Sequence, residues 1–405
     1  MSTTPLILVM VGLPARGKSY TARKLARYLR WQGVNARVFN VGSYRRERLG
    51  SGQPAAFFDP DNERGVEQRR QMAMAALDDV FAFLQASGEV AIYDATNATR
   101  SRRERVRRRC EEQGVRVVFI ESVCTDPEIV AANVRATKVG SPDYTSASPD
   151  DAVTDFRARI AHYERAYQPL CSDHDEDLSW VKVVDVGRSV LVNRVYNMRA
   201  RRLAFYLMNL HIQPRTVWLT RHGESAYNVV GRIGGDSALS DRGVAYASRL
   251  SEFLPQRLSA PPRVFTSTLV RTNQTADYLP WEHTPLKALD EIDAGVCDGW
   301  TYQEVAVRLP DEFEARKADK LRYRYPRGES YQDVIRRLNP VIVDIERSRR
   351  PVVVVAHQAV LRALYAYLVG ESQEACPHLE MPLHTVIELV PHAYGVNETR
   401  HRLGP

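Results

Sequence analysis

The stretch "LILVMVGLPARGKS", residues 6–19, decides the fold of the first half of the chain. It opens with six apolar residues and then turns into a glycine-rich loop, which is typical of a buried strand leading into a phosphate-binding loop. The loop residues 12–19, "GLPARGKS", match the pattern G-x-x-x-x-G-K-[ST] in full. A helix-forming stretch follows over Lys18–Gln32. The order strand, loop and helix therefore predicts a P-loop.

The P-loop predicts ATP as a ligand. Backbone N–H groups of such a loop wrap phosphates at a helix N-terminus, Lys18 supplies positive charge to the β and γ oxygens, and Ser19 can bind Mg²⁺. Asp94, in "AIYDATN", stands at the carboxyl end of another apolar run, where open α/β sheets bind their ligands. We expect Asp94 to hold Mg²⁺ through water or to accept the proton of the acceptor hydroxyl. Capping of the next helix is its structural alternative.

Short apolar runs alternate with helix-like stretches along the chain, which predicts an α/β fold with parallel sheets covered on both faces. In the first half the expected strands are 6–12, 36–42, 89–96, 115–124 and 181–187. A second series begins at 216–223 and continues at 263–268, 351–358 and 385–391. A proline in "HIQPRT" separates the two series. A chain of 405 residues can form two domains, which we place at residues 1–212 and 213–405.

The composition excludes several classes of protein. Apolar residues make up 44% of the chain and charged residues 26%, and no apolar run approaches the roughly 20 residues of a membrane span. The chain enters a strand directly, without the features of a signal peptide, so we expect a cytoplasmic protein. Five scattered cysteines without CxxC spacing indicate neither a disulfide framework nor a zinc site.

The net charge of +7 is compatible with nucleic acid, an anionic membrane or small anionic substrates. Its densest part is "RSRRERVRRRC", residues 100–110, with seven arginines. This run has no aromatic residue on which bases could stack. The plain interpretation is a solvated helix face.

A second site is predicted around "LTRHGES", residues 219–225, which follows an apolar strand. A neutral imidazole at His222 can attack phosphorus and carry the phosphoryl group. The neighbouring Arg221 can bind phosphate oxygens and lower the pKa of the histidine. Another apolar strand ends at His357 in "VVVVAHQAVLR", with Arg362 further on. Two strand-end histidines with arginines predict a cationic phosphate pocket that needs no metal.

The reaction at such a pocket also needs an acid, because an alkoxide is a poor leaving group until it is protonated. Glu291 in "LDEIDAG" is our choice among the acidic residues. Asp290 and Asp293 are close competitors.

Long motifs in one order make the chain resemble the bifunctional 6-phosphofructo-2-kinase/fructose-2,6-bisphosphatase family. They include "VMVGLPARGKSY", "FNVGSYRRE", "DATNATR", "YQPL", "QPRTVWLTRHGES", "EIDAGVC", "RYPRGESYQDV" and "PLHTV". The resemblance implies a P-loop kinase followed by a member of the histidine phosphatase (phosphoglycerate-mutase-like) superfamily. It implies synthesis of fructose 2,6-bisphosphate from ATP and fructose 6-phosphate, and hydrolysis of the 2-phosphate through a phosphohistidine. It further implies Mg²⁺ with ATP, no cofactor at the phosphatase site, and a homodimer without nucleic-acid or membrane partners.

The resemblance also implies site residues. For ATP they are Gly12, Leu13, Pro14, Ala15, Arg16, Gly17, Lys18, Ser19, Tyr20, Asn133 and Lys138. For fructose 6-phosphate they are Arg45, Arg69, Thr96, Arg102, Lys138, Arg159 and Tyr163. For fructose 2,6-bisphosphate they are Arg221, Asn228, Gly234, Arg271, Tyr302, Arg316, Lys320, Tyr331, Gln358 and Arg362. The implied catalytic groups are Lys18, Asp94, Cys124, Arg221, His222, Glu291 and His357. Within the basic run only Arg102 is implied as a ligand, so the other arginines keep the solvated-face interpretation.

One stretch departs from the family. "CDGWTY", residues 297–302, stands where a more acidic stretch is typical of relatives, shortly after Glu291. The alternative function for the whole chain is a nucleic-acid end-processing enzyme that combines a kinase with a phosphatase. Its binding would weaken steeply with salt as counterions are released.

Overall fold

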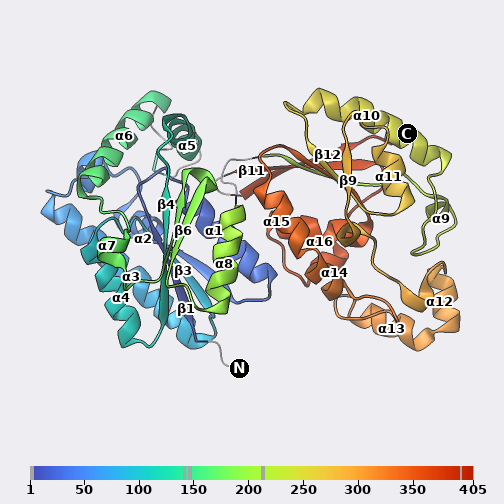
Figure 1. Cartoon of the computed structure of the whole chain (residues 1–405), viewed down its shortest axis with the longest axis horizontal. Coiled ribbons are helices and arrows are strands. Elements are labelled where there is room, and N and C mark those ends of the chain that lie inside the picture. The colour runs from blue at the N-terminus through green and yellow to red at the C-terminus, as the bar shows by residue number, and fades with distance from the viewer. Residues whose placement is uncertain (1–3, 140–142, 145–147, 211–214, 393–394, 405) are drawn as a thin grey trace. The chain divides into compact units, whose positions relative to one another are not determined.

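The computed structural model describes residues 4–139, 143–144, 148–210, 215–392 and 395–404. The chain divides into two compact units, Met1–Ile212 and Gln213–Pro405. Each unit contains a six-stranded sheet flanked by helices (Figure 1). The predicted α/β class is confirmed for both, since most neighbouring strands in each sheet run parallel.

The sheet of the first unit has the order β2-β3-β1-β4-β5-β6. Its strands are β1 (Leu6–Val11), β2 (Ala36–Asn40), β3 (Val90–Asp94), β4 (Arg116–Val123), β5 (Trp180–Val184) and β6 (Ser189–Asn193). The five expected strands are present, and they pair in parallel. The sixth strand, β6, was not predicted, and it runs antiparallel to β5 at the edge of the sheet.

Helices cover both faces of this sheet because its central strands are apolar on both sides. All six residues of β1 are buried. Figure 1 shows α3 and α4 on one side of the sheet and α1 and α8 on the other. The helices are α1 (Lys18–Trp31), α2 (Val41–Leu49), α3 (Glu63–Ala86), α4 (Arg100–Glu112), α5 (Pro127–Val139), α6 (Pro149–Ala166), α7 (Ser172–Asp175) and α8 (Met198–Asn209), with 3-10 helices η1 (Ala55–Phe58) and η2 (Asp185–Gly187).

The sheet of the second unit has the order β12-β11-β7-β10-β8-β9. Its strands are β7 (Val217–Arg221), β8 (Arg263–Thr266), β9 (His283–Pro285), β10 (Val352–Ala356), β11 (Thr385–His392) and β12 (Gly395–Arg402). The four expected strands are confirmed, whereas β9 and β12 were not predicted. The strands β7, β10, β8 and β9 pair in parallel, and β11 is antiparallel to both of its neighbours. The parallel centre brings the carboxyl ends of β7 and β10 to one edge.

One core of the second unit lies between its sheet and the helices α10 and α11. Trp218 of β7 and Val353 of β10 are buried there against Leu250 of α10. The helices of this unit are α9 (Ala226–Val229), α10 (Asp241–Arg257), α11 (Val270–Ala276), α12 (Tyr302–Arg308), α13 (Pro310–Ala318), α14 (Tyr331–Arg337), α15 (Asn339–Arg347) and α16 (Gln358–Val369), with 3-10 helices η3 (Lys287–Leu289), η4 (Gly295–Cys297) and η5 (Cys376–His378).

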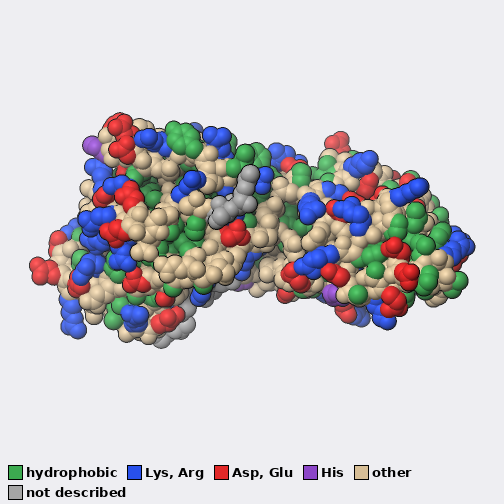
Figure 2. Space-filling view, turned by 90° about the horizontal axis from the view of Figure 1, so that it is seen from below, with side chains coloured by type: hydrophobic (Ala, Val, Ile, Leu, Met, Phe, Trp, Pro, Cys, Tyr) green, Lys and Arg blue, Asp and Glu red, His purple; other side chains and the backbone are tan. Residues whose placement is uncertain are grey.

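The surface carries both signs of charge. On the face shown in Figure 2, acidic and basic side chains are interspersed. Among the described residues, no helix combines the length and the apolar character that crossing a bilayer requires.

Candidate active sites

The phosphate-binding loop of the first unit runs from the end of β1 to the start of α1. Gly12 has φ +131°, and a Cβ there would lie 2.5 Å from the carbonyl oxygen of Ser122, so only glycine fits. Gly17 is the N-cap of α1 and has a left-handed conformation. Among the residues that the structure describes, no side chain caps this end of the helix by a hydrogen bond. The first N–H groups of α1 are therefore free of a side-chain cap, as an anion site at a helix N-terminus requires.

Lys18 and Asp94 lie close together at this loop. The Lys18 ammonium donates to the carbonyl of Leu13 over 2.6 Å. Burial lowers the pKa of Lys18 to about 8, and the nearby negative charge of Asp94 opposes that shift. Asp94 ends β3 and is 3% exposed. It does not cap the next helix, because Thr99 caps α4.

Asn40 holds Asp94, a role that no sequence pattern indicated. Its amide nitrogen donates to Asp94 Oδ2 over 2.5 Å, and its amide oxygen caps α2 by accepting from the N–H of Ser43. The register of β2 with β3 places the two residues side by side. One carboxylate oxygen of Asp94 is thus fixed by Asn40, and α2 is tied to the same point.

Other predicted ATP residues surround the loop in different ways. The Asn133 amide on α5 donates to the carbonyl of Ala15 over 3.1 Å. Arg16 lies 3.6 Å from Glu164 of α6. Tyr20 lies on α1, where the Lys24 ammonium is 5.3 Å from its ring centre. The side chain of Lys138 lies outside the described residues.

Arginines gather around Phe58 of η1, where the acceptor sugar phosphate is predicted to bind. The guanidinium of Arg159 stacks 3.6 Å from the Phe58 ring centre, and that of Arg45 lies 5.4 Å from it. The ring of Tyr163 is 6.1 Å from Phe58. Burial lowers the pKa of Arg69, and the positive charges of Arg102 and Arg159 lower it further. Arg45, Arg69, Arg102 and Arg159 therefore share one cationic region.

An acid that the sequence reasoning missed lies in this region. Asp143 is 2.5 Å from Arg45, 3.7 Å from Arg159 and 3.8 Å from Arg46. Burial and the charge of Arg159 lower the pKa of Arg45, and Asp143 opposes them. Asp143 stands in the run "SPDY", residues 141–144, and no pattern in the sequence indicated its contacts with these arginines.

Thr96 and Cys124 are the two remaining predicted residues of the first unit. The backbone carbonyl of Thr96 accepts from the N–H of Gly12 over 3.0 Å, so this residue lies beside the loop. Cys124 follows β4 and is 4% exposed, and burial raises the pKa of its thiol. A thiol of this kind stays protonated at neutral pH.

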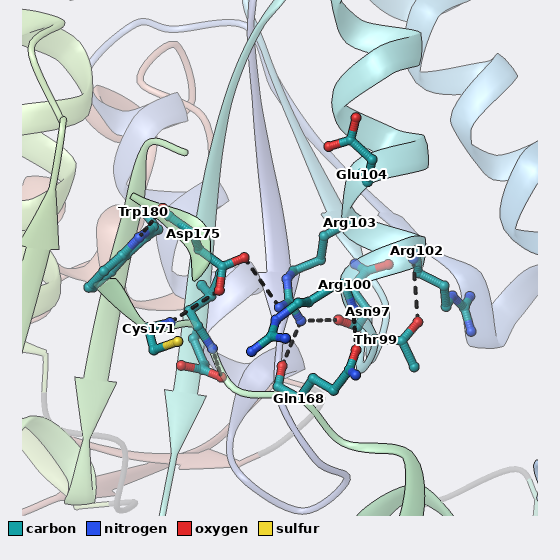
Figure 3. Close-up of polar contacts among 12 residues, drawn as sticks. Asn97, Thr99, Arg100, Arg102, Arg103, Glu104, Gln168, Cys171, Asp175 and Trp180 are labelled. Carbon is teal, nitrogen blue, oxygen red and sulfur yellow. Dashed lines mark hydrogen bonds and ion pairs between the residues drawn. The ribbon is translucent and has the colours of Figure 1, made fainter. Parts of the chain in front are cut away.

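The solvated-face interpretation of the basic run is wrong for Arg103. This side chain is 1% exposed and points toward Gln168 and Asp175 (Figure 3). It donates to the carbonyl of Gln168 over 2.7 Å and lies 3.4 Å from Asp175. These acceptors replace water around the buried charge. The Arg107 side chain, by contrast, is 36% exposed and pairs with Glu104 and Glu111 on its own helix.

In the second unit His222 follows β7 and is 3% exposed. Its Nδ1 donates to the carbonyl of Gly223 over 2.6 Å, so Nε2 carries the lone pair. Nε2 accepts from Nε of Arg271 over 3.1 Å. Burial, then Arg271 and Arg221, lower the pKa of His222 well below its usual value of 6.5. The imidazole is therefore neutral at physiological pH, as a nucleophile must be.

His357 follows β10 and lies beside His222, with 5.0 Å between the ring centres. It is fully buried, and its Nε2 contacts the Ser267 hydroxyl at 2.7 Å. Ser267 in turn accepts from the N–H of Leu269 and lies 2.8 Å from the Thr272 hydroxyl. Ser267 and Thr272 were not predicted. The run "STLVRT", residues 267–272, contains three hydroxyl residues near Arg271, but no pattern connected them with a histidine 90 residues from Ser267.

Glu291 is held at the start of α16. Its Oε1 accepts from the N–H groups of Ile292 and Ala359 over 2.9 and 3.2 Å. Its charge raises the pKa of Arg221, which burial lowers to about 10, so these two side chains are neighbours. The competitors have other contacts: Asp290 accepts from the hydroxyl and N–H of Thr268, and Asp293 accepts from the N–H of Gly295.

A cavity of about 480 Å³ joins these groups. Among its lining residues are His222, Glu291 and every predicted contact for fructose 2,6-bisphosphate: Arg221, Asn228, Gly234, Arg271, Tyr302, Arg316, Lys320, Tyr331, Gln358 and Arg362. His357 is not part of the lining. Burial and the charges of Arg362 and Arg316 lower the pKa of Lys320 to about 8, which marks a second cationic cluster. Tyr323, Tyr325 and Arg232 also line the cavity and were not predicted.

Both units match models of known protein families. The family model for 6-phosphofructo-2-kinase matches residues 1–214, and that for the histidine phosphatase superfamily (branch 1) matches residues 217–402. Among solved structures, an alpha-ribazole phosphatase from Shigella flexneri is 23% identical with a TM-score of 0.42, covering 47% of this chain and 96% of that one.

Two curated relatives match nearly the whole chain. It is 50% identical over 397 residues to 6-phosphofructo-2-kinase/fructose-2,6-bisphosphatase 3 of Rattus norvegicus, covering 98% of this chain and 71% of the relative. It is 49% identical over 396 residues to 6-phosphofructo-2-kinase/fructose-2,6-bisphosphatase 4 of Homo sapiens, covering 98% of this chain and 84% of the relative. The chain therefore belongs to the bifunctional 6-phosphofructo-2-kinase/fructose-2,6-bisphosphatase family.

Proposed function

We propose that the chain makes and degrades fructose 2,6-bisphosphate. Residues 1–212 transfer a phosphoryl group from ATP to the 2-hydroxyl of fructose 6-phosphate, and residues 213–405 remove it as phosphate. One observation carries the proposal best. The cavity of the second unit contains both the His222 pocket and the Arg316, Lys320 and Arg362 cluster, which suits a sugar that carries two phosphates.

In the kinase reaction the chain mainly positions the substrates and neutralises charge, as phosphoryl transfer requires. The backbone of the loop and Lys18 bind the ATP phosphates. Arg45, Arg69, Arg102 and Arg159 bind the phosphate of the acceptor sugar through charge-assisted hydrogen bonds. Asp94 takes the proton of the sugar hydroxyl or orients the metal. Asn40 fixes one oxygen of Asp94 and leaves the other for either role.

A kinase that uses ATP works with a divalent metal, and we propose Mg²⁺ held by Ser19 and Asp94. Hydroxyl and carboxylate oxygens are the hard ligands that this ion prefers, and Asp94 lies beside Lys18 of the loop. When bound, Mg²⁺ neutralises charge on the β and γ phosphates. For the phosphatase site we propose no cofactor, because buried arginines supply the positive charge there.

In the phosphatase reaction Nε2 of His222 attacks the phosphorus of the 2-phosphate. The bond between phosphorus and the sugar oxygen breaks, and Glu291 gives that oxygen its proton. Arg221 and Arg271, which line the cavity, hold the phosphoryl oxygens, and His357 supports the phosphate pocket from its buried position beside His222. Glu291 then takes a proton from water, which attacks the phosphohistidine and releases phosphate with a neutral His222.

Several broader features belong to this proposal. The partners are small molecules, without nucleic acid or membrane. We propose a homodimer, for which the exposed edge strand β6 of the first unit is a candidate contact: Leu191 and Val192 are 51% and 49% exposed. We propose a cytoplasmic location, since the five cysteines are free, as a reducing compartment keeps them.

The test is to incubate the chain with ATP and fructose 6-phosphate and to identify the sugar product by ³¹P NMR. Fructose 2,6-bisphosphate is expected, followed by release of phosphate when ATP is exhausted. Phosphorylation of a nucleic-acid 5′ end, weakening steeply with salt, would support the alternative function instead. On the face shown in Figure 2 the charges are interspersed and form no continuous basic track for such a substrate.

A further inference from the structure

The segment Cys297–Tyr302, whose sequence departs from the family, is hydrogen-bonded to the loop Arg232–Gly235. The N–H of Gly299 donates to the carbonyl of Ile233, and the N–H of Ile233 donates to the carbonyl of Trp300, both over 2.8 Å. The Arg232 guanidinium donates to the carbonyl of Gly299 over 2.7 Å. The fourth contact involves a side chain of the segment itself, since Asp298 Oδ1 accepts from the N–H of Gly235 over 2.8 Å.

The bound loop holds Arg271 in turn. The carbonyl of Gly235 accepts from Nη1 of Arg271 over 2.7 Å, while Nε of the same guanidinium donates to Nε2 of His222 over 3.1 Å. Three hydrogen bonds thus connect Asp298, Gly235, Arg271 and His222 in series. Each hydrogen bond in this series fixes the position of the next group.

The loop needs such support because its turn is made by two glycines in succession. Gly234 and Gly235 have φ values of +69° and +60°, a region that other residues rarely adopt. A Cβ on Gly234 would also lie 1.7 Å from Asp298 Oδ1. Two adjacent glycines have many backbone conformations available, so an external acceptor for the Gly235 N–H selects one of them.

We propose that Asp298 is a positioning residue for the phosphatase reaction, which fixes Gly235 and thereby holds the Arg271 guanidinium against His222. The proposal rests on the proposed function of the second unit. Asp298 is exposed and does not line the cavity, so it acts through Arg271 rather than by touching substrate. Its neighbour Asp236 has a different task, since it accepts from the N–H of Val270 at the start of α11.

The positioning role of Asp298 predicts that its replacement changes the turnover rate but not KM. A misplaced Arg271 costs transition-state stabilisation, and displacements of about 1 Å cost up to about 10²-fold in rate. Substrate binding also depends on Arg316, Lys320 and Arg362, which Asp298 does not contact. The turnover rate should therefore fall while KM for fructose 2,6-bisphosphate changes little.

The experiment measures single-turnover phosphohistidine formation in the full chain. Asp298→Ala should lower this rate about 10- to 100-fold, with KM within about threefold of wild type. Asp298→Asn keeps an oxygen that can accept from Gly235 and should retain most of the rate. Glu304→Ala is the matched control, because the Glu304 carboxylate accepts from the N–H of Thr301 in the capping box of α12 rather than from Gly235. The Glu304→Ala variant should form phosphohistidine at the wild-type rate.

Several results would overturn the inference. They are an unchanged rate in Asp298→Ala, an equal loss in Glu304→Ala, or a loss confined to KM. Kinase activity serves as the folding control, and Asp298→Ser carries the same test if the alanine variant does not fold. If the wild-type chain forms no phosphohistidine, the proposed function fails. If it forms one and Asp298→Ala does so equally fast, only the inference fails.

Discussion

Replacing Arg103 by methionine should destabilise the first unit far more than replacing any other arginine of the basic run. Methionine has a similar length and fills the space, but it offers nothing to the acceptors around the guanidinium. Those acceptors are the carbonyls of Asn97 and Gln168 and the carboxylate of Asp175 (Figure 3). Each of them would lose a donor, and the carboxylate of Asp175, which is 4% exposed, would lose its charged partner.

The magnitude follows from the burial of the pair. The side chains of Arg103 and Asp175 are 1% and 4% exposed. Removing one partner of such a buried ion pair costs about 3–5 kcal/mol, because the other charge stays buried without compensation. That is a large share of the roughly 5–15 kcal/mol by which a domain is stable. The exposed pairs of Arg107 contribute only about 0–1 kcal/mol.

The assay is urea denaturation followed separately by the two activities. With a urea dependence of about 2–3 kcal/mol per molar, Arg103→Met should lose kinase activity at a midpoint about 1–2.5 M lower than wild type. The midpoint for phosphatase activity should stay in place. Arg107→Ala is the matched control on the same helix and should shift neither midpoint. The double variant Arg103→Met/Asp175→Asn should recover part of the loss, since it removes the stranded charge.

The reasoning would be refuted if Arg103→Met and Arg107→Ala had the same midpoint. It would also be refuted if the second substitution in the double variant added its own full cost, because the two side chains would then act independently.

Three further predictions concern the sites. Arg45→Ala should raise KM for fructose 6-phosphate by roughly 10- to 100-fold, because it removes a charge-assisted bond to the sugar phosphate; steady-state kinetics with an unchanged KM for ATP would confirm this, and equal losses for both substrates would contradict it. Glu291→Gln should slow phosphohistidine formation by about 10²–10⁴-fold in quench-flow, and a normal rate would move the acid role to Asp290 or Asp293. The depressed pKa of His222 keeps it neutral at pH 6, where a histidine with the ordinary pKa would be only about one quarter neutral; the rate of phosphohistidine formation should therefore not fall between pH 7.5 and 6, and a fourfold decline would show an ordinary histidine.

The sequence predicted those strands that are buried on both faces. β1 and β10 are continuous apolar runs, and every residue in them is buried. The strand β12, "GVNETRHR", is mostly exposed, so it carries no apolar pattern from which a strand could be predicted. β6, "SVLVN", also has no buried residue, and its apolar run of three residues is too short to indicate a strand.

Charge alone could not separate the arginines of α4. Arg103, Val106 and Cys110 form the buried face of this helix, and their spacing was available in the sequence. The arginine was nevertheless assigned to water, because the acceptor Asp175 lies 72 residues away and no local pattern connects them. Helical periodicity would have been a better guide here than residue type.

The candidate site residues were predicted as types and positions, but their supporting contacts were not. Asn40 meets Asp94 only through the pairing of β2 with β3. Ser267 meets His357 across neighbouring strands β8 and β10. Both depend on sheet register, which sequence patterns do not determine for strands buried on both faces.

Phosphoenzyme formation from fructose 2,6-bisphosphate labelled at the 2-phosphate tests most directly the central claim, which is that the chain has two independent sites. Wild type and Lys18→Ala should form the same acid-labile phosphoenzyme, with the label mapping to His222, although Lys18→Ala has lost most of its kinase activity. His222→Ala should form none and should still synthesise the bisphosphate from ATP. Label on another residue, or loss of both activities in either folded variant, would contradict the claim.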